Sequence, residues 1–145
     1  MIKYIREKRI TLNKNRFDLK AVYHDPCNYG RKAQKLFGQG FYDEPRWIMS
    51  QCLPTWQDLY PAREHQFCCG GGGGTMTTGY NRERLHYGRK KIQQLKDAGA
   101  EMIVVPCHSC HGQLNNLKEA CDMPHLRVIY LWELVAECLV VQGRP

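Results

Sequence analysis

The sequence lacks the signals of a membrane-spanning or secreted protein. No apolar run reaches the roughly eighteen residues that a transmembrane helix needs. The N-terminal stretch MIKYIREKRITLNKNR is charged and has no apolar segment of the kind found in signal peptides. A P-loop is excluded too, because no lysine followed by serine or threonine comes after the glycine run. We therefore expect no direct membrane span and a reducing, cytoplasmic setting.

Acidic residues are scarce relative to basic ones, 14 against 21, which gives a formal net charge of +7. Basic side chains gather near the N-terminus and again along residues 82–96. Neither stretch carries interleaved aromatics or a known nucleic-acid-binding motif, so we expect no nucleic-acid partner. Two interpretations stay open for these charges: a solvated helix face, and a docking surface for an acidic protein partner.

Cysteine, by contrast, is abundant. A chain of 145 residues is about one domain and buries roughly 70% of its unfolded surface, so it needs no disulfide to fold. Five of the eight cysteines lie in three short motifs: Cys27 in HDPCNYG, Cys68 and Cys69 in FCCGGGGGT, and Cys107 and Cys110 in VVPCHSCHGQL. In a reducing compartment, clustered cysteines more often bind metal than pair with each other.

Apolar strands and helical segments alternate along the chain. Strands are predicted over 19–24, 65–68, 101–105 and 127–131, and helices over 29–38, 79–97, 109–120 and 131–140. Residues 39–63 should form loops with one or two short helices, because three prolines interrupt them. Strands separated by helices predict an α/β, Rossmann-like fold with a parallel sheet of about four strands flanked by helices.

Particular side chains are expected to line or cap the helices. In the first helix, Ala33, Leu36 and Phe37 fall on one side. Thr77 or Thr78 can cap the second helix, and its inner stripe is expected to consist of Tyr80, Leu85, Ile92 and Leu95.

Each cysteine motif follows a predicted strand. In a parallel sheet every right-handed crossover returns the chain to the same end, so ligands collect beyond the carboxyl ends of the strands. We therefore expect one shared site there. Cys107 and Cys110 should also lie at a helix N-terminus, where backbone N–H groups and the helix dipole favour thiolates.

The vicinal pair Cys68 and Cys69 favours a multi-iron centre over zinc. Adjacent thiolates reach one tetrahedral ion with difficulty, and five thiolates exceed what one zinc takes, whereas a cluster offers several metal atoms. The glycines that follow provide no core packing. We expect Gly70, Gly71 and Gly72 to let the backbone approach the bound group, with amides facing its sulfides. A structural zinc site is the alternative.

Three histidines lie near the cysteines in sequence: His24, His108 and His111. His108 is our candidate proton donor to a leaving thiolate, since the unperturbed histidine pKa is near neutrality. The alternative for each is a hydrogen bond to sulfur or a surface position. Asp25, just before a proline, is interpreted as a turn residue. Outside the motifs, Cys121 and Cys138 should pack helices, and Cys52 has no assigned role.

The motifs HDPCNYGR, CCGGGGG and PCHSCHGQL resemble the cysteine-rich CCG domain of heterodisulfide reductase catalytic subunits and their relatives. The resemblance spans residues 20 to 138, and these motifs are most similar to those of the K subunit of the membrane complex associated with dissimilatory sulfite reductase. Relatives usually carry two such domains. The expected organisation is a basic extension or linker over 1–18, one CCG domain over 19–141 and a tail over 142–145, as the C-terminal part of a longer subunit.

This resemblance implies a [4Fe–4S] cluster, noncubane in the heterodisulfide reductases, ligated by Cys27, Cys68, Cys69, Cys107 and Cys110. The implied function is oxidoreductase chemistry, the reductive cleavage of a disulfide or trisulfide. The alternative is electron transfer in a glycolate, lactate or glycerol-phosphate oxidoreductase. The implied partners are the other domains of the subunit, membrane electron-transfer subunits and a small thiol-carrying protein, with the complex peripheral to the inner membrane.

Overall fold

The computed structural model describes residues 1–141, so the predicted tail over 142–145 lies outside the described residues. At its centre is a parallel sheet with strand order β2-β1-β3-β4. The strands are β1 (Ala21–Tyr23), β2 (Gln57–Asp58), β3 (Met102–Val105) and β4 (Arg127–Tyr130). This confirms the predicted α/β fold with four parallel strands.

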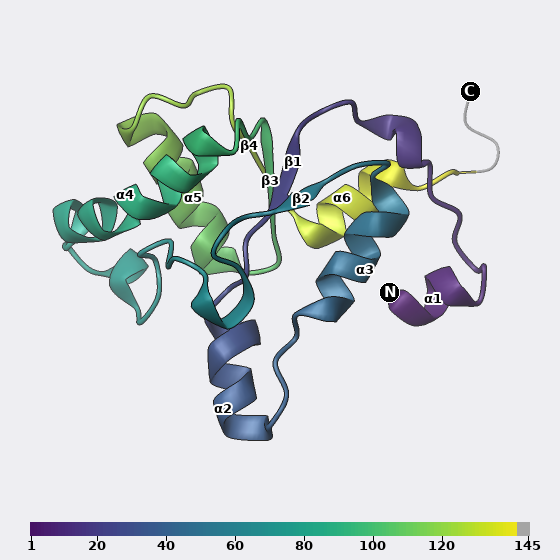
Figure 1. The fold of residues 1–145 in the computed structure, drawn as a ribbon, viewed down its shortest axis with the longest axis horizontal. Coiled ribbons are helices and arrows are strands. Elements are labelled where there is room, and N and C mark those ends of the chain that lie inside the picture. The colour runs from purple at the N-terminus through teal and green to yellow at the C-terminus, as the bar shows by residue number, and fades with distance from the viewer. Residues whose placement is uncertain (142–145) are drawn as a thin grey trace.

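Helices cover both faces of the sheet (Figure 1). One face packs against α3 (Asp43–Cys52) and α6 (Leu131–Cys138), and the other against α4 (Asn81–Asp97) and α5 (His108–Ala120). Two short helices are α1 (Ile2–Arg6) and α2 (Ala33–Phe37). Single turns of other helix types occur at Asn28–Lys32, Lys14–Arg16, Arg63–His65 and Thr75–Thr77. Within residues 1–141, no helix has the length and apolarity to cross a membrane.

The two apolar cores follow from the alternation of side chains along β3. Met102 and Val104 face α3 and α6, whereas Ile103 and Val105 face α4 and α5. All four are fully buried, as expected of a central parallel strand covered on both faces. Helices on both sides therefore leave only the ends of the strands accessible for a site.

The strand predicted over 65–68 is wrong. In its place the fourth strand is β2, whose residues Gln57 and Asp58 pair with Val22 and Tyr23 of β1. Because β2 occupies that edge of β1, residues 65–68 do not pair with β1. They form a loop after the 3-10 turn Arg63–His65.

The predicted inner side of the first helix is also wrong in part. Ala33 is buried, but Leu36 and Phe37 are 72% and 78% exposed. The reason is position: α2 projects away from the layered body of the protein (Figure 1). A helix that stands outside the layers has no core to receive its apolar side chains.

The second helix begins later than its predicted cap. Thr77 and Thr78 belong to or follow the preceding 3-10 turn, and α4 starts after Tyr80 without a side-chain cap. Tyr80 is exposed, whereas Ile92 and Leu95 are buried as predicted.

The N-terminal residues contact the rest of the chain. Ile2, Leu12 and Phe17 pack against the core beside α3 and α6, and Leu12 forms an antiparallel bridge with Leu139. Apolar residues spaced among the basic ones account for this packing. The boundary at residue 18 stays a prediction.

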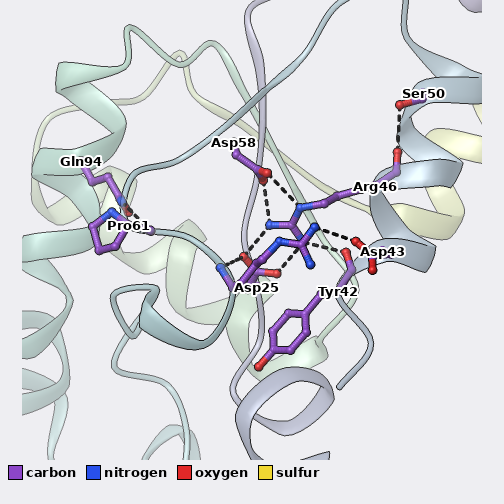
Figure 2. A network of polar contacts seen from close by, with 9 residues as sticks. Asp25, Tyr42, Asp43, Arg46, Ser50, Asp58, Pro61 and Gln94 are labelled. Atoms are coloured by element: carbon purple, nitrogen blue, oxygen red, sulfur yellow. Dashed lines mark hydrogen bonds and ion pairs between the residues drawn. The ribbon is translucent and has the colours of Figure 1, made fainter. Parts of the chain in front are cut away.

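Arg46 of α3 lies at the centre of a buried ion network (Figure 2). Its guanidinium donates to both carboxylate oxygens of Asp25 at 2.8 Å and to those of Asp58 at 2.9 and 2.7 Å. It also donates to the Tyr42 carbonyl, and Asp25 accepts the Arg63 backbone N–H. Asp25, predicted to be a turn residue, is 3% exposed and joins several segments.

Replacing Arg46 with methionine should destabilise the protein by about 3–5 kcal/mol, because it leaves a buried carboxylate without its partner. The measurement is the free energy of unfolding in urea. Arg127→Met is the matched control, since the Arg127–Glu137 pair is half-exposed and its loss should cost less than about 1 kcal/mol. Equal losses in the two variants would contradict the assignment.

Candidate metal centre

The structure brings the five cysteines to the carboxyl edge of the sheet. Cys27 follows β1 and Cys107 follows β3, as predicted, whereas Cys68 and Cys69 reach the edge through a loop. The Sγ atoms of Cys27 and Cys68 are 3.9 Å apart. Cys69 is in hydrogen-bonding contact with Cys68 and Cys110, and Cys110 with Cys107. The sulfurs thus form a continuous row, and their role as ligands stays a prediction.

Exposure changes along this row. Cys69 and Cys110 are buried, Cys27 and Cys107 are half-buried, and Cys68 is exposed. A metal centre held by these sulfurs would therefore have one protected side toward the sheet and one side accessible from solvent. The accessible side is the one at Cys68.

Backbone amides of the glycine loop face the vicinal pair. The N–H of Gly70 donates to Cys68 Sγ at 3.3 Å. Hydrogen bonds from the Cys110 and Cys68 thiols, followed by one from the Gly71 amide, hold the pKa of Cys69 well below its ordinary value. The contacts of Cys110 with Cys107 and Cys69 raise the pKa of Cys110 in turn.

The first two glycines are required by packing against helices. A Cβ on Gly70, whose φ is +89°, would lie 2.5 Å from the Arg84 carbonyl of α4, and one on Gly71 would lie 2.7 Å from Gln113 Cβ of α5. Gly72 has open space around it. The predicted close approach thus exists, but at Gly70 and Gly71 the neighbours are helices of this chain. Their contact with a bound group stays a prediction.

Cys107 lies at the N-terminus of α5. The neighbouring Cys110 thiol, followed by the N–H groups of Cys110 and Ser109, outweighs burial and lowers the pKa of Cys107 to about 6. This agrees with the expected effect of unpaired N–H groups in the first helical turn. The arrangement follows from the sequence, since Pro106 separates the strand from Cys107 and the helix begins directly after it.

Cys27 has the opposite environment. Its hydrogen bond to Cys68 and its burial raise the pKa of Cys27 to about 12, although Arg31 acts to lower it. The Arg31 guanidinium donates to Cys27 Sγ at 3.1 Å and to the carbonyls of Glu64 and Gln66 at 3.2 Å. Arg31 was not predicted as a site residue; its position four residues after Cys27 in a helical stretch was the available signal.

His24 lies on the protected side of the sulfurs. It is fully buried, its ring is within 4.8 Å of the Cys69 and Cys110 sulfurs, and neither ring nitrogen has a hydrogen-bond partner among residues 1–141. Burial, followed by the charge of Lys91, lowers the pKa of His24 to about 3, so the imidazole is neutral. A buried N–H without an acceptor costs about 1–3 kcal/mol. Sulfur of a bound metal centre would supply that acceptor, so the residues fit such a group.

His108 is exposed beside Cys107, and its Nδ1 contacts the Tyr130 hydroxyl. The Tyr130 ring stacks on His111 and on Trp132, with ring centroids 3.9 and 4.3 Å apart. An aromatic stack therefore leads from the Cys107 motif to Trp132, which is 46% exposed. Proton donation by His108 stays a prediction.

The other cysteines lie apart from the row. Cys52 and Cys138 are buried in the core beside α3 and α6, where the Cys138 thiol donates to the Cys52 carbonyl at 3.5 Å. Cys121 is half-buried just after α5 and packs against the opposite core. All three occupy packing positions.

Lys91 is the most unexpected residue near the site. The sequence places it in a basic stretch with Arg89 and Lys90, which are exposed, yet Lys91 is 1% exposed. Its spacing from Gly88 and Leu95 puts it on the inner face of α4, which is the signal that was missed.

Comparison with known proteins shows what the chain is similar to. The sequence model of the CCG family, described as a cysteine-rich domain, matches residues 21–115. An Hdr-like menaquinol oxidoreductase iron-sulfur subunit of Archaeoglobus profundus is 29% identical over 110 residues, 71% of this chain. Iron-sulfur subunit 2 of the corresponding enzyme from Archaeoglobus fulgidus is 26% identical over 94% of the chain.

A third relative is one of the subunits of the dihydromethanophenazine:CoB–CoM heterodisulfide reductase of Methanosarcina barkeri, 29% identical over 81% of the chain. This chain spans only 19%, 25% and 27% of the lengths of these three relatives. The similarity therefore concerns only a part of each relative.

Thiol labelling of the metal-free, reduced protein should distinguish Cys107 from Cys27. At neutral pH Cys107, with a pKa of about 6, is mostly thiolate, whereas Cys27, with a pKa of about 12, is protonated. Iodoacetamide should therefore label Cys107 before Cys27, and labelling of Cys107 should slow below about pH 6. Mass spectrometry of digested peptides measures both rates. The two are similarly half-buried, so equal rates would contradict the assigned environments.

Proposed function

The chain belongs to the cysteine-rich CCG domain family, and we propose that it is the iron–sulfur domain of an Hdr-like oxidoreductase. The observation that carries the proposal is the row of five sulfurs at the sheet edge, with amides facing Cys68 and Cys69. Behind the sulfurs lies His24, whose ring nitrogens have no hydrogen-bond partner in the described part of the chain. The relatives described as iron-sulfur subunits support it.

Several metal atoms suit this row better than one zinc ion. The vicinal pair divides between two sides, because Cys68 is exposed and adjoins Cys27, whereas Cys69 is buried and adjoins Cys110 and His24. One tetrahedral ion takes four ligands gathered around a point. A row of five sulfurs suits a [4Fe–4S] cluster, of the noncubane kind in the finer form of the proposal.

We further propose that the reaction is reductive cleavage of a disulfide or trisulfide. A bound cluster would supply electrons one at a time. Cleavage of one S–S bond consumes two electrons and two protons, and it yields two thiols from a disulfide or a thiol and a persulfide from a trisulfide. The exposed Cys68 borders a cavity of about 570 Å³ that Arg31 and Lys90 also line. Their charges stabilise developing thiolates, and His108, beside Cys107 at the other end of the row, is the proposed proton donor.

The proposed partners are the other domains of the subunit, membrane-bound electron-transfer subunits and a small protein that carries the thiol substrate. The exposed Arg89 and Lys90 on α4 would attract an acidic carrier. In the most specific form, the chain acts in dissimilatory sulfur metabolism like the K subunit of the sulfite-reductase-associated complex, at the cytoplasmic side of the inner membrane.

Electron transfer without bond cleavage is the second candidate function. The stack of Tyr130 and Trp132 favours it, because these rings connect the Cys107 motif with an exposed surface where a redox partner could bind.

Metal analysis tests the cofactor. Anaerobically reconstituted protein should contain iron and acid-labile sulfide, and serine at Cys69 or Cys110 should reduce both, because these inner sulfurs are the most protected. Cys121→Ser is the matched control and should keep the wild-type content. Zinc without iron in the wild type would support the structural zinc site and refute the proposal.

A substrate test separates the two candidate functions. Adding a small disulfide to the oxidised, cluster-loaded protein should change its electron paramagnetic resonance signal if a substrate sulfur binds at the cluster. Electron transfer alone predicts an unchanged signal. Arg31→Met should weaken the effect without lowering the iron content, since Arg31 lines the cavity beside Cys68.

A further inference from the structure

A buried ammonium group lies under the candidate metal centre. Lys91, in the middle of α4, is 1% exposed, and its Nζ donates to Gln94 Oε1 at 2.6 Å. Among residues 1–141, no carboxylate lies within 4.0 Å of this nitrogen. Burying an ammonium ion without a counter-charge costs several kcal/mol, so its presence calls for an anion nearby.

The available anions are the sulfurs. Burial lowers the pKa of Lys91 to about 8, and the strongest opposing influence comes from Cys69, with smaller ones from Asp25, Cys68 and Cys110. Asp25 does not serve as the counter-charge, because its two oxygens already accept from Arg46 and Arg63.

The packing of α4 explains how Lys91 comes to face the site. One turn earlier on the same helix face, a Cβ on Gly88 would lie 2.7 Å from the Cys69 carbonyl, so α4 lies directly against the Cys69 backbone. One turn later, Gln94 donates to the Pro61 carbonyl at 3.1 Å. The helix is thus held against both the cysteine loop and the loop after β2. The Lys91 charge also acts on His24, on the protected side of the sulfurs.

We propose that Lys91 is the built-in counter-charge of the metal centre, a positioning residue that stabilises the negative charge of the reduced cluster and raises its reduction potential. The inference rests on the proposed iron–sulfur function. It distinguishes Lys91 from Arg89 and Lys90, which face solvent on the same helix. Reduction adds negative charge to the cluster, and a fixed positive charge in the low-dielectric interior favours that state.

The test compares Lys91→Met with Lys91→Arg and with Lys96→Met, a control at an exposed lysine of the same helix, in the cluster-loaded protein, by redox titration followed with electron paramagnetic resonance. Lys91→Met should shift the oxidised-to-reduced ratio at least tenfold toward the oxidised form, which is about 59 mV for a one-electron couple. Lys91→Arg keeps the positive charge, so its reduction potential should stay close to that of the wild type. Lys96→Met should change the potential less, and its effect should disappear at high salt.

Stability of the metal-free protein provides the second measurement. If Lys91 serves the cluster and not the fold, Lys91→Met should unfold in urea at a midpoint equal to or above that of the wild type. The variant removes a costly buried charge, and in the metal-free protein a sulfur that loses this counter-charge can take up a proton. Failure of this variant to fold, or a lower midpoint, would make Lys91 a structural residue and overturn the inference.

The redox result separates this inference from the proposed function. A wild-type protein that takes up no iron and sulfide would refute the proposed function itself. A loaded wild type and a loaded Lys91→Met variant with the same potential would refute only the role of Lys91.

Discussion

The buried guanidinium of Arg46 is the constraint on which the cysteine site depends. It joins α3 to Asp25 after β1 and to Asp58 of β2, and Asp25 in turn holds the backbone of Arg63. Cys27 lies two residues after Asp25, and the chain from Arg63 leads to the vicinal cysteines. The network therefore fixes both segments that meet where Cys27 and Cys68 are 3.9 Å apart. These segments have little regular structure of their own, so ion pairs replace the sheet and helix bonds that position Cys107.

The two halves of the sulfur row are held by different means. At Cys107 and Cys110, a helix N-terminus supplies the amides and fixes the spacing. At Cys68 and Cys69, a glycine loop supplies them, and two of its glycines are pressed against α4 and α5. Behind both halves lie the neutral His24 and the cation Lys91. The site thus combines an accessible side at Cys68 with a buried side that faces a neutral imidazole and an ammonium group.

Prediction from the sequence succeeded where the pattern is local. The strands β1, β3 and β4 end at prolines or lead directly into helices, and their apolar residues pack on both faces. The prediction failed where contacts with distant segments decide the local structure. Residues 65–68 resemble a strand, but β2 takes the place beside β1. Leu36 and Phe37 form an apolar pair, but α2 stands outside the layers.

The sequence by itself determined the α/β class and the meeting of the Cys27 and Cys107 motifs at one sheet edge, since parallel connections return both motifs to the same side. The Cys68 and Cys69 motif reaches that edge through a loop, not a strand. Only the tertiary structure decided which charges are buried. Asp25 resembles an ordinary turn residue and Lys91 an ordinary surface lysine, yet they are 3% and 1% exposed. Local sequence does not encode such burial, because a charge is tolerated inside only when distant segments bring the partner that compensates it.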